Sequence, residues 1–270
     1  NDTLYPSVNQ SPDGSRVIYE TLFEDDFESN KGWIINGEWE RNVPEGLGGS
    51  SGGADPLVAY NGDTILGTDL TGLGEYPGDY EPGLLENEYY AISPAMDCFY
   101  YTNVTLRFHR WLNIEITDKA NIQVSYDEGA TWQTVWTNQS FNIANAWNQQ
   151  TVPLKPINRK SNARFRFTLG PTDFNDNYSG WNIDNLVVTG DYVTKDVGVI
   201  GWLNPNGQCG LSSQEEVTVI VKNFGALASP AVIPVGFSLD GGATWQKDTI
   251  IGSIPVDGTV TLTFDPKADF

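Results

Sequence analysis

The chain has 270 residues, with 15 basic and 35 acidic side chains and a net charge of −20. This charge disfavours nucleic acid and anionic membrane surfaces as partners, and no apolar run is long enough to insert into a membrane. The 28 glycines and 15 prolines, together with many Thr, Val, Trp and Tyr, predict an all-β chain long enough for two domains. Since no signal peptide is present, we expect a mature or excised piece of a longer polypeptide.

Acidic side chains alternate near the start of the chain. Residues 1–20 are polar and are expected to be a lead-in segment. In residues 22–28, Glu24, Asp26 and Glu28 share one strand face, opposite two phenylalanines. Same-face neighbours lie about 7 Å apart, so adjacent carboxylates can reach one calcium ion, which takes 6–8 oxygen ligands. The alternative is a solvated edge strand protected by charge.

Residues 37–94 are rich in Gly, Asp and Tyr and show little periodicity. A structureless stretch of this length inside a compact domain is usually functional. Its aspartates and carbonyls can complete a calcium shell, and its tyrosines can form a surface for a ligand. The alternative is an ordered loop cover held down by its own aromatic rings. The tyrosines proposed for ligand binding are Tyr76, Tyr80, Tyr89 and Tyr90.

Alternating strands follow the loop-rich region. Residues 104–111 alternate, and residues 120–126 return through 131–136 as a hairpin. Residues 163–169 alternate again. Antiparallel strands, long loops and chain ends that meet near one site predict a jelly-roll β-sandwich over residues 21–192.

Residues 178–189 contain a carboxylate in an apolar strand. Trp181 and Ile183 share one strand parity and Leu186 and Val188 the other, which requires either a bulge near Asp184 or a strand buried on both faces. No nearby Lys or Arg can pair with Asp184, so a bound cation is the obvious candidate.

Residues 195–270 predict a smaller immunoglobulin-like sandwich, because Val217, Val219 and Val221 alternate with polar residues and residues 259–264 repeat the pattern. We expect the parent polypeptide to continue beyond Phe270, since this module lacks a closing strand. Residues 125–132 and 238–245 share the pattern S-x-D-x-G-x-T-W. This Asp-box pattern is typical of a hairpin turn capped by Asp and is interpreted as structural.

The sequence offers little support for catalysis. His109 is the only histidine, and it lies in the middle of a predicted strand, so histidine zinc sites are disfavoured and any catalytic triad must include it. No phosphate-binding loop, dinucleotide fingerprint or zinc motif occurs. Cys98 and Cys209 form either one disulfide or two buried thiols, and the sequence leaves both alternatives open.

Several short motifs occur in the order seen in MAM-like jelly-roll modules of secreted bacterial adhesins and peptidases, including the cleaved-adhesin type, with a more distant likeness to reelin subrepeats. The matching segments are residues 23–28, 67–70, 92–94, 105–108, the first Asp-box and 180–185. The resemblance covers about residues 20–192. It implies a non-catalytic domain with a structural calcium ion held between the first strand, a loop and the last strand. The implied ligands are Asp26, Glu28, Asp69 and Asp184, followed by Asp63 and Glu24.

Residues 195–270 resemble CARDB-like immunoglobulin modules of Bacteroidetes surface proteins exported by the type IX system. The resemblance rests on residues 209–211, 219–225, 238–242 and 267–269. It implies O-glycans at Asp-Ser/Thr-apolar sites, which fit Thr3, Thr64 and Thr249.

Together these patterns predict a calcium-stabilised, non-catalytic adhesion or binding segment of a large secreted or cell-surface protein. The expected partners are a protein or carbohydrate on a cell surface or in the extracellular matrix, and neighbouring domains of the same polypeptide. The alternative is an accessory module that docks substrate for a secreted peptidase or stabilises it.

Overall fold

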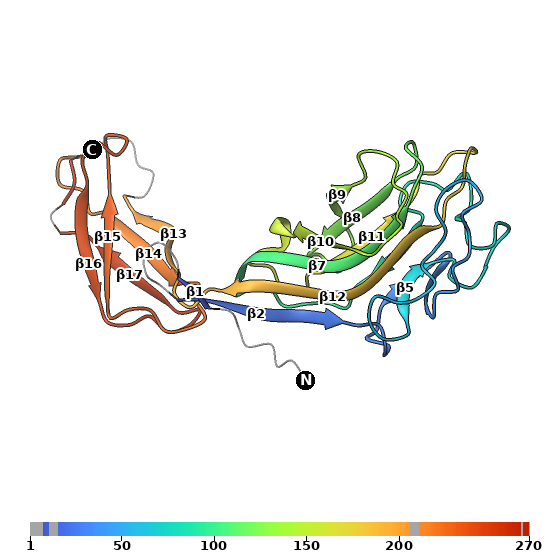
Figure 1. The fold of residues 1–270 in the computed structure, drawn as a ribbon. Coiled ribbons are helices and arrows are strands. Elements are labelled where there is room, and N and C mark those ends of the chain that lie inside the picture. The colour runs from blue at the N-terminus through green and yellow to red at the C-terminus, as the bar shows by residue number, and fades with distance from the viewer. Residues whose placement is uncertain (1–7, 11–15, 206–210, 266, 270) are drawn as a thin grey trace. The chain divides into compact units, whose positions relative to one another are not determined.

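The computed structural model describes residues 8–10, 16–205, 211–265 and 267–269, and for residues 8–18 only the backbone. The chain divides into two compact units, residues 1–192 and 193–270. The described residues form seventeen strands and one short 3-10 helix, Lys155–Ile157, without any α-helix (Figure 1). The prediction of an all-β chain is therefore confirmed.

Two antiparallel sheets make up the first unit. The seven-stranded sheet has the order β1-β2-β12-β5-β4, and β7 pairs with both β12 and β10. Its strands are β1 (Val8–Gln10), β2 (Arg16–Asp25), β4 (Trp39–Asn42), β5 (Ile65–Thr68), β7 (Tyr101–Asn113), β10 (Asn148–Pro153) and β12 (Gly180–Tyr192). The five-stranded sheet consists, in spatial order, of β3 (Ile34–Ile35), β6 (Tyr89–Ile92), β11 (Arg164–Leu169), β8 (Ala120–Ser125) and β9 (Gln133–Thr137).

The apolar faces of these two sheets form one core. Leu106 and Phe108 of β7 and Ile183 of β12 are buried with Phe165 and Phe167 of β11. Alternation explains this arrangement, since every second side chain of a strand points to the same face. The predicted jelly-roll sandwich is confirmed.

Strand β12 contains the predicted bulge. Asp184 pairs with His109 and Val187 with Arg107, so two residues of β12 oppose one residue of β7. Asn185 adopts φ +48° at this point. The extra residue shifts the alternation by one position, so that the apolar side chains in the second half of the strand point to the same core as those in the first half. The first half of β12 is buried on both faces. The two alternatives predicted from the sequence, a bulge and a strand buried on both faces, therefore both occur in β12.

Strand β2 differs from the expectation at both ends. It begins at Arg16, inside the expected lead-in segment, and pairs along β12. It ends at Asp25. Two residues later, Phe27 has a positive φ of +59°, and this conformation breaks the alternation of side chains. Asp26 and Glu28 therefore lie in the turn after the strand instead of on one strand face.

The second unit is the smaller sandwich. Its strands are β13 (Val197–Asn204), β14 (Thr218–Asn223) and β17 (Thr259–Thr263) in one sheet, and β15 (Val232–Phe237) and β16 (Gln246–Ile251) in the other. The predicted alternation holds: Val217, Val219, Val221 and Phe264 are buried in a separate core.

The two Asp-boxes form the same turn. Asp127 accepts hydrogen bonds from Ser125 and Thr131, and Asp240 accepts the equivalent bonds from Ser238 and Thr244. The first box joins β8 to β9, which confirms the predicted hairpin.

Cys98 is buried in the core of the first unit. Cys209 lies outside the described residues, so the question of their pairing stays open. The described part of the chain contains no helix that could cross a membrane.

Candidate functional site

The outer face of the seven-stranded sheet carries polar and aromatic side chains over four adjacent strands. Because Leu106 and Phe108 point into the core, Arg107, His109 and Trp111 of β7 take the opposite parity. Register then places Gln149 of β10 beside His109, since these two residues are paired across the strands. On the other side, β12 and β2 complete the same face.

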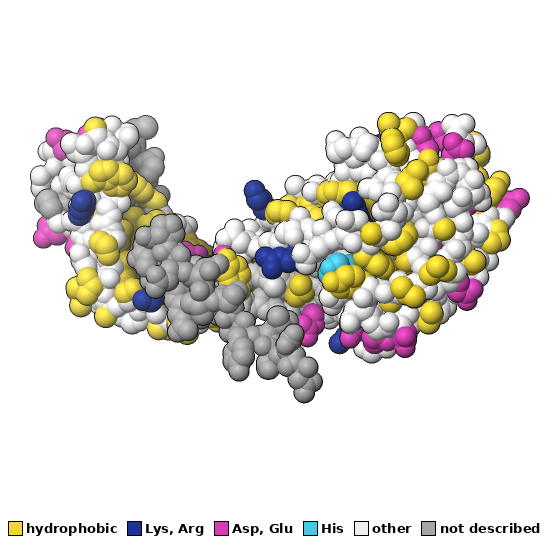
Figure 2. Space-filling view, in the orientation of Figure 1, with side chains coloured by type: hydrophobic (Ala, Val, Ile, Leu, Met, Phe, Trp, Pro, Cys, Tyr) yellow, Lys and Arg dark blue, Asp and Glu magenta, His cyan; other side chains and the backbone are white. Residues whose placement is uncertain are grey.

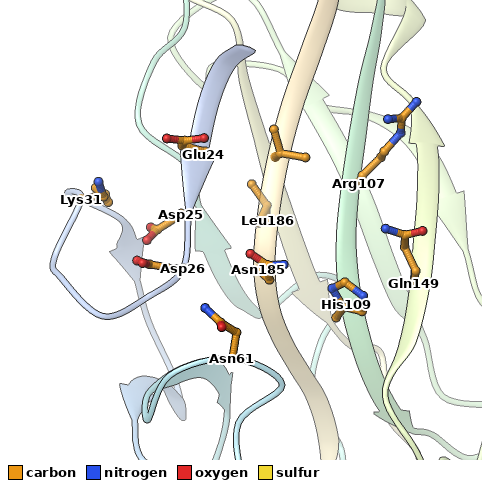
Figure 3. Close-up of a pocket in the computed structure, with 11 residues that line it drawn as sticks. Glu24, Asp25, Asp26, Lys31, Asn61, Arg107, His109, Gln149, Asn185 and Leu186 are labelled. Atoms are coloured by element: carbon orange, nitrogen blue, oxygen red, sulfur yellow. The ribbon is translucent and has the colours of Figure 1, made fainter. Parts of the chain in front are cut away.

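A groove of about 430 Å³ crosses this face. Figure 3 shows Glu24, Asp25 and Asp26, at the end of β2 and just after it, on one side of the groove and Arg107, His109 and Gln149 on the other. The lining residues are Glu24, Asp25, Asp26, Lys31, Asn61, Arg107, His109, Gln149, Asn185, Leu186 and Val187. Hydrogen-bond donors of Arg107 and Gln149 thus face acceptors of Asp and Glu across one opening, and Lys31 lies on the acidic side.

Aromatic rings border the groove beside His109. The ring of Tyr60 lies parallel to the imidazole, with centroids 3.5 Å apart and an interplanar angle of 10°. Trp147 lies edge-on to Tyr60 at 6.5 Å and to Trp111 at 6.1 Å. Tyr60 is 47% exposed, so part of this side chain is open to solvent. Figure 2 shows the histidine side chain at the surface, with hydrophobic side chains next to it.

Burial lowers the pKa of His109, which favours the neutral imidazole. Its Nδ1 atom is buried and has no hydrogen-bond partner among the described residues. Because Tyr60 covers the imidazole, His109 is poorly placed to exchange protons with a substrate. The expectation of a strand histidine held by its neighbours agrees with this geometry.

The carboxylate of Asp184 is fully buried, but backbone N–H groups provide its partners. Asn61 N donates to Oδ2 at 2.8 Å, and Asn185 N donates to Oδ1 at 2.6 Å. Burial nevertheless raises the pKa of Asp184 to about 6. The absence of a nearby Lys or Arg therefore does not by itself require a cation, since amides satisfy this carboxylate.

Glu28 binds the same loop from the other side. Its Oε1 accepts hydrogen bonds of 2.8 Å from Asp63 N and from Thr64 N, and these amides lower its pKa. The structure thus brings Glu28, Asp63 and Asp184 to one loop, residues 60–64. Calcium ligation by these residues stays a prediction.

The other acids at the end of β2 and just after it are divided between surface and interior. Glu24 and Asp26 are exposed. The buried acid is Asp25, whose carboxylate accepts Phe27 N and Trp33 Nε1, both at 2.8 Å. Asp25 thus ties the end of β2 to the following turn.

Asp69 is placed away from the residues predicted to share its ion. It follows β5, is buried, and accepts the backbone N–H groups of Leu73 and Gly78. Its charged neighbours are the carboxylates of Glu40 and Glu81. Burial raises its pKa to about 6.

The four tyrosines proposed for ligand binding do not form one surface. Tyr80 is fully buried, and its hydroxyl donates to Asp118 Oδ2 at 2.5 Å, so its ring offers no face to a ligand. Tyr89 and Tyr90 are half-buried in β6, where successive side chains point to opposite faces. Tyr76 is 43% exposed and borders a second hollow, near Phe174.

The expected glycosylation sites differ in accessibility. Thr249 is exposed on β16. The Thr64 hydroxyl is half-buried and donates to the carbonyl of Phe27 at 2.5 Å. Thr3 lies outside the described residues.

One further group of acids can hold a metal ion. Among the described residues, carboxylate oxygens of Glu115, Asp118 and Asp173 lie within 4.8 Å of one another. Thr117 donates to Glu115 at 2.6 Å and to Asp173 at 2.8 Å. Sequence reasoning did not find this group, because Asp173 comes from a different loop from Glu115 and Asp118.

Sequence reasoning also missed Tyr60, Trp111 and Trp147, whose rings lie beside the groove next to His109. Trp111 could have been placed on the outer face from the sequence, because it lies at the same alternate positions of the strand as Arg107 and His109. Tyr60 lies in the aperiodic segment, where no parity can be assigned.

Comparisons with known proteins agree with the fold. The family model described as Reelin subrepeat B matches residues 109–189, which confirms the expected likeness to reelin subrepeats over that range. No curated protein matches the chain. The CARDB-like character of residues 195–270 stays a prediction.

Solved structures similar to this chain include adhesin and carbohydrate-binding domains. The K3 cleaved adhesin domain of Lys-gingipain from Porphyromonas gingivalis W83 is 17% identical, with a TM-score of 0.41 and coverage of 63% of this chain and 100% of that one. The CBM22-1 xylan-binding domain of Paenibacillus barcinonensis Xyn10C is 14% identical, with a TM-score of 0.38 and coverage of 64% and 95%.

Proposed function

We propose that the first unit is a non-catalytic binding module of a secreted or cell-surface protein and that its outer-face groove binds a carbohydrate. The observation that carries this proposal is the stack of Tyr60 on His109 beside Trp147. A stacked ring is held rigid, so little conformational entropy is lost when a ligand packs on its exposed part.

The chemistry of the groove suits a polyhydroxylated ligand. Sugar rings have apolar C–H faces that pack on aromatic rings, and hydroxyls that both donate and accept hydrogen bonds. Arg107, Asn61 and Gln149 supply donors, and Glu24 and Asp26 supply acceptors. A catalytic pair that depends on histidine is disfavoured here, since Tyr60 covers the only histidine of the chain.

Calcium stabilisation is part of this proposal. It is supported by the net charge of −20 and by carboxylates that lie close together, such as Glu115, Asp118 and Asp173. Repulsion between such groups falls when a divalent cation binds. Chelation with EDTA should then lower the melting temperature by several degrees.

A glycan array tests the binding proposal. The chain should bind a defined set of glycans, and Tyr60→Ala and Trp147→Ala should each weaken that binding at least roughly tenfold, as expected for an aromatic hot spot. Trp245→Ala is the matched control, because Trp245 is 56% exposed in the second unit.

Two results would contradict the proposal. One is wild-type affinity for the same glycans in both groove variants. The other is release of shortened sugar products, which would show a catalytic domain. Binding to a protein instead of a glycan would show that the groove has a different class of ligand.

A further inference from the structure

A second hollow in the first unit, of about 660 Å³, lies outside the outer-face groove and takes no part in the function proposed above. Its lining comes from four segments that connect strands, those after β4, β5, β7 and β11. Its volume is within the range of roughly 300–1,000 Å³ that ligand sites have. The hollow shares no lining residue with the groove, so the two are separate candidate sites.

Phe174 lines this hollow and is displayed by a tight turn. Asp173 Oδ1 accepts the backbone N–H of Asn175 at 2.7 Å, a bond of the kind that closes an Asx turn. Asp173 Oδ2 accepts Nδ2 of Asn175 and Oγ1 of Thr117, both at 2.8 Å. A β-carbon built on Gly83 would lie 2.7 Å from Cζ of Phe174, so the ring rests against the backbone there. Phe174 is nevertheless 86% exposed, the most of any large hydrophobic side chain that the structure describes.

A single exposed hydrophobic side chain is common on protein surfaces, but here the aromatic lining is combined with acids. Tyr76 is a second ring of the lining and is 43% exposed. The charged residues are Asp79, Glu115 and Asp176, and no Lys, Arg or His belongs to the described lining. Asp79 is buried and accepts two backbone N–H groups, whereas Asp176 is exposed. Aromatic rings and negative charges therefore line one opening.

Two carboxylates at this hollow remain ionised at neutral pH. Burial acts to raise the pKa of Glu115, but hydrogen bonds from Thr117 outweigh it and the pKa is lowered. Hydrogen bonds from Asn175 and Thr117 likewise lower the pKa of Asp173, which adjoins Glu115. Lys119 is a basic residue nearby in the chain, but its Nζ donates to a backbone carbonyl at 3.3 Å. The hollow therefore keeps a negative charge that no basic side chain of its described lining neutralises.

We propose that this hollow binds an arginine side chain from a protein partner. Its charge is complementary to a cation, and a guanidinium group can stack on Phe174 or Tyr76 while it bonds a carboxylate such as Asp176. Lysine fits less well, because its ammonium group is a point charge without a planar face. The amides of Asn175 and Asn177 both donate and accept hydrogen bonds, so they suit the partner's peptide groups beside the arginine. The site is independent of glycan binding by the groove and of calcium.

The test is an NMR titration of the whole chain with the peptide acetyl-Gly-Gly-Arg-Gly-Gly-amide, in EDTA so that no divalent cation competes for the acids. A peptide with citrulline in place of arginine is the control for charge, since citrulline has nearly the same shape but is neutral. The arginine peptide should bind at least roughly tenfold more tightly, because its hydrogen bonds to carboxylates are assisted by charge.

Two variants locate the bound peptide. Phe174→Ala and Asp176→Asn should each weaken its binding roughly two- to fivefold, the contribution of an exposed cation–π contact or ion pair. Both positions are exposed, so the melting temperature should stay that of the wild type. The controls are Glu128→Gln, which removes one exposed charge beyond the far end of β8, and Trp245→Ala, which removes an exposed ring in the second unit. Both controls should bind the peptide as the wild type does.

Equal weakening by Asp176→Asn and Glu128→Gln would show that the net charge of −20 attracts the peptide, and would overturn the site. No binding of the arginine peptide, or equal affinity for the citrulline peptide, would also overturn it. Competition between the peptide and a glycan that the chain binds would place both ligands at one site and contradict a separate hollow. Tyr60→Ala should leave peptide binding unchanged, so failure of the carbohydrate proposal and failure of this one are distinguishable.

Discussion

Tyr60 lies parallel to His109 with 3.5 Å between the ring centroids, and this contact joins the aperiodic loop to the central strand β7. It covers the imidazole and leaves part of the Tyr60 side chain open to solvent. The stack is therefore both a structural contact and the centre of the proposed binding surface.

Replacement of Tyr60 by Ala should raise the pKa of His109 towards its ordinary value of about 6.5, because the imidazole becomes hydrated. Loss of the ring pair should also reduce the free energy of unfolding by about 1 kcal/mol. An NMR pH titration of the histidine measures the first effect and urea unfolding the second. Tyr76→Ala is the control, since Tyr76 is similarly exposed but lies outside this stack. An unchanged pKa in Tyr60→Ala would show that the stack does not shield His109.

The stability of the first unit should depend on pH through Glu38. Burial and the charge of Asp69 raise the pKa of Glu38 from 4.5 to about 8. Between these two values the folded chain holds more protons than the unfolded chain, so the free energy of unfolding falls as pH rises from 5 to 8. Asp184, with a pKa of about 6, adds to this slope below pH 6. His109 has the opposite effect below its ordinary pKa. Because its pKa is lowered in the folded chain, the unfolded chain binds more protons at this residue, and the free energy of unfolding rises with pH.

Urea unfolding in EDTA at several pH values measures this dependence. Glu38→Gln cannot titrate and should show a clearly smaller slope between pH 6 and 8. Equal slopes for wild type and Glu38→Gln would contradict the account.

Gly74→Ala should destabilise the first unit more than Gly32→Ala. Both glycines have positive φ, +72° and +91°, so each substitution carries backbone strain of about 1–2 kcal/mol. Only the β-carbon at Gly74 would meet carboxylate oxygens, whereas that at Gly32 would meet nothing within 4 Å. Urea unfolding should show an additional loss of stability for Gly74→Ala alone. Equal losses of unfolding free energy in the two variants would contradict a close contact between Gly74 and these carboxylate oxygens.

Asp184→Asn should reduce the free energy of unfolding by about 1–3 kcal/mol, because an amide nitrogen would replace one of two buried acceptors. Asp26→Asn is the matched control, since Asp26 is exposed and should change stability little. Urea unfolding in EDTA compares the two variants. If they lose the same free energy, the amides of Asn61 and Asn185 do not stabilise the loop through Asp184.

Much of the fold could be predicted because period-2 alternation is a local property. The parities of Trp181 and Leu186 predicted either a bulge in β12 or burial on both of its faces, and the repeated Asp-box predicted the β8–β9 hairpin turn. The same alternation placed the valines of residues 217–221 in the second core.

The site was harder to predict, because it depends on contacts between distant segments. Tyr60 and His109 are joined only after the loop folds back on the sheet. Glu38 and Asp69 meet through a strand register that the Gly-rich sequence did not reveal. Tyr80 was expected on a binding surface, but Asp118 accepts its hydroxyl in the interior, which makes its burial favourable.

The central claim is that the outer-face groove binds a carbohydrate, and NMR of the single histidine tests it most directly. Addition of a glycan that the chain binds should shift the ring signals of His109, because the ligand would pack on Tyr60 above it. The shift should saturate with the same dissociation constant as the binding measured by calorimetry. Saturated binding with unchanged His109 signals would place the ligand elsewhere and contradict the account.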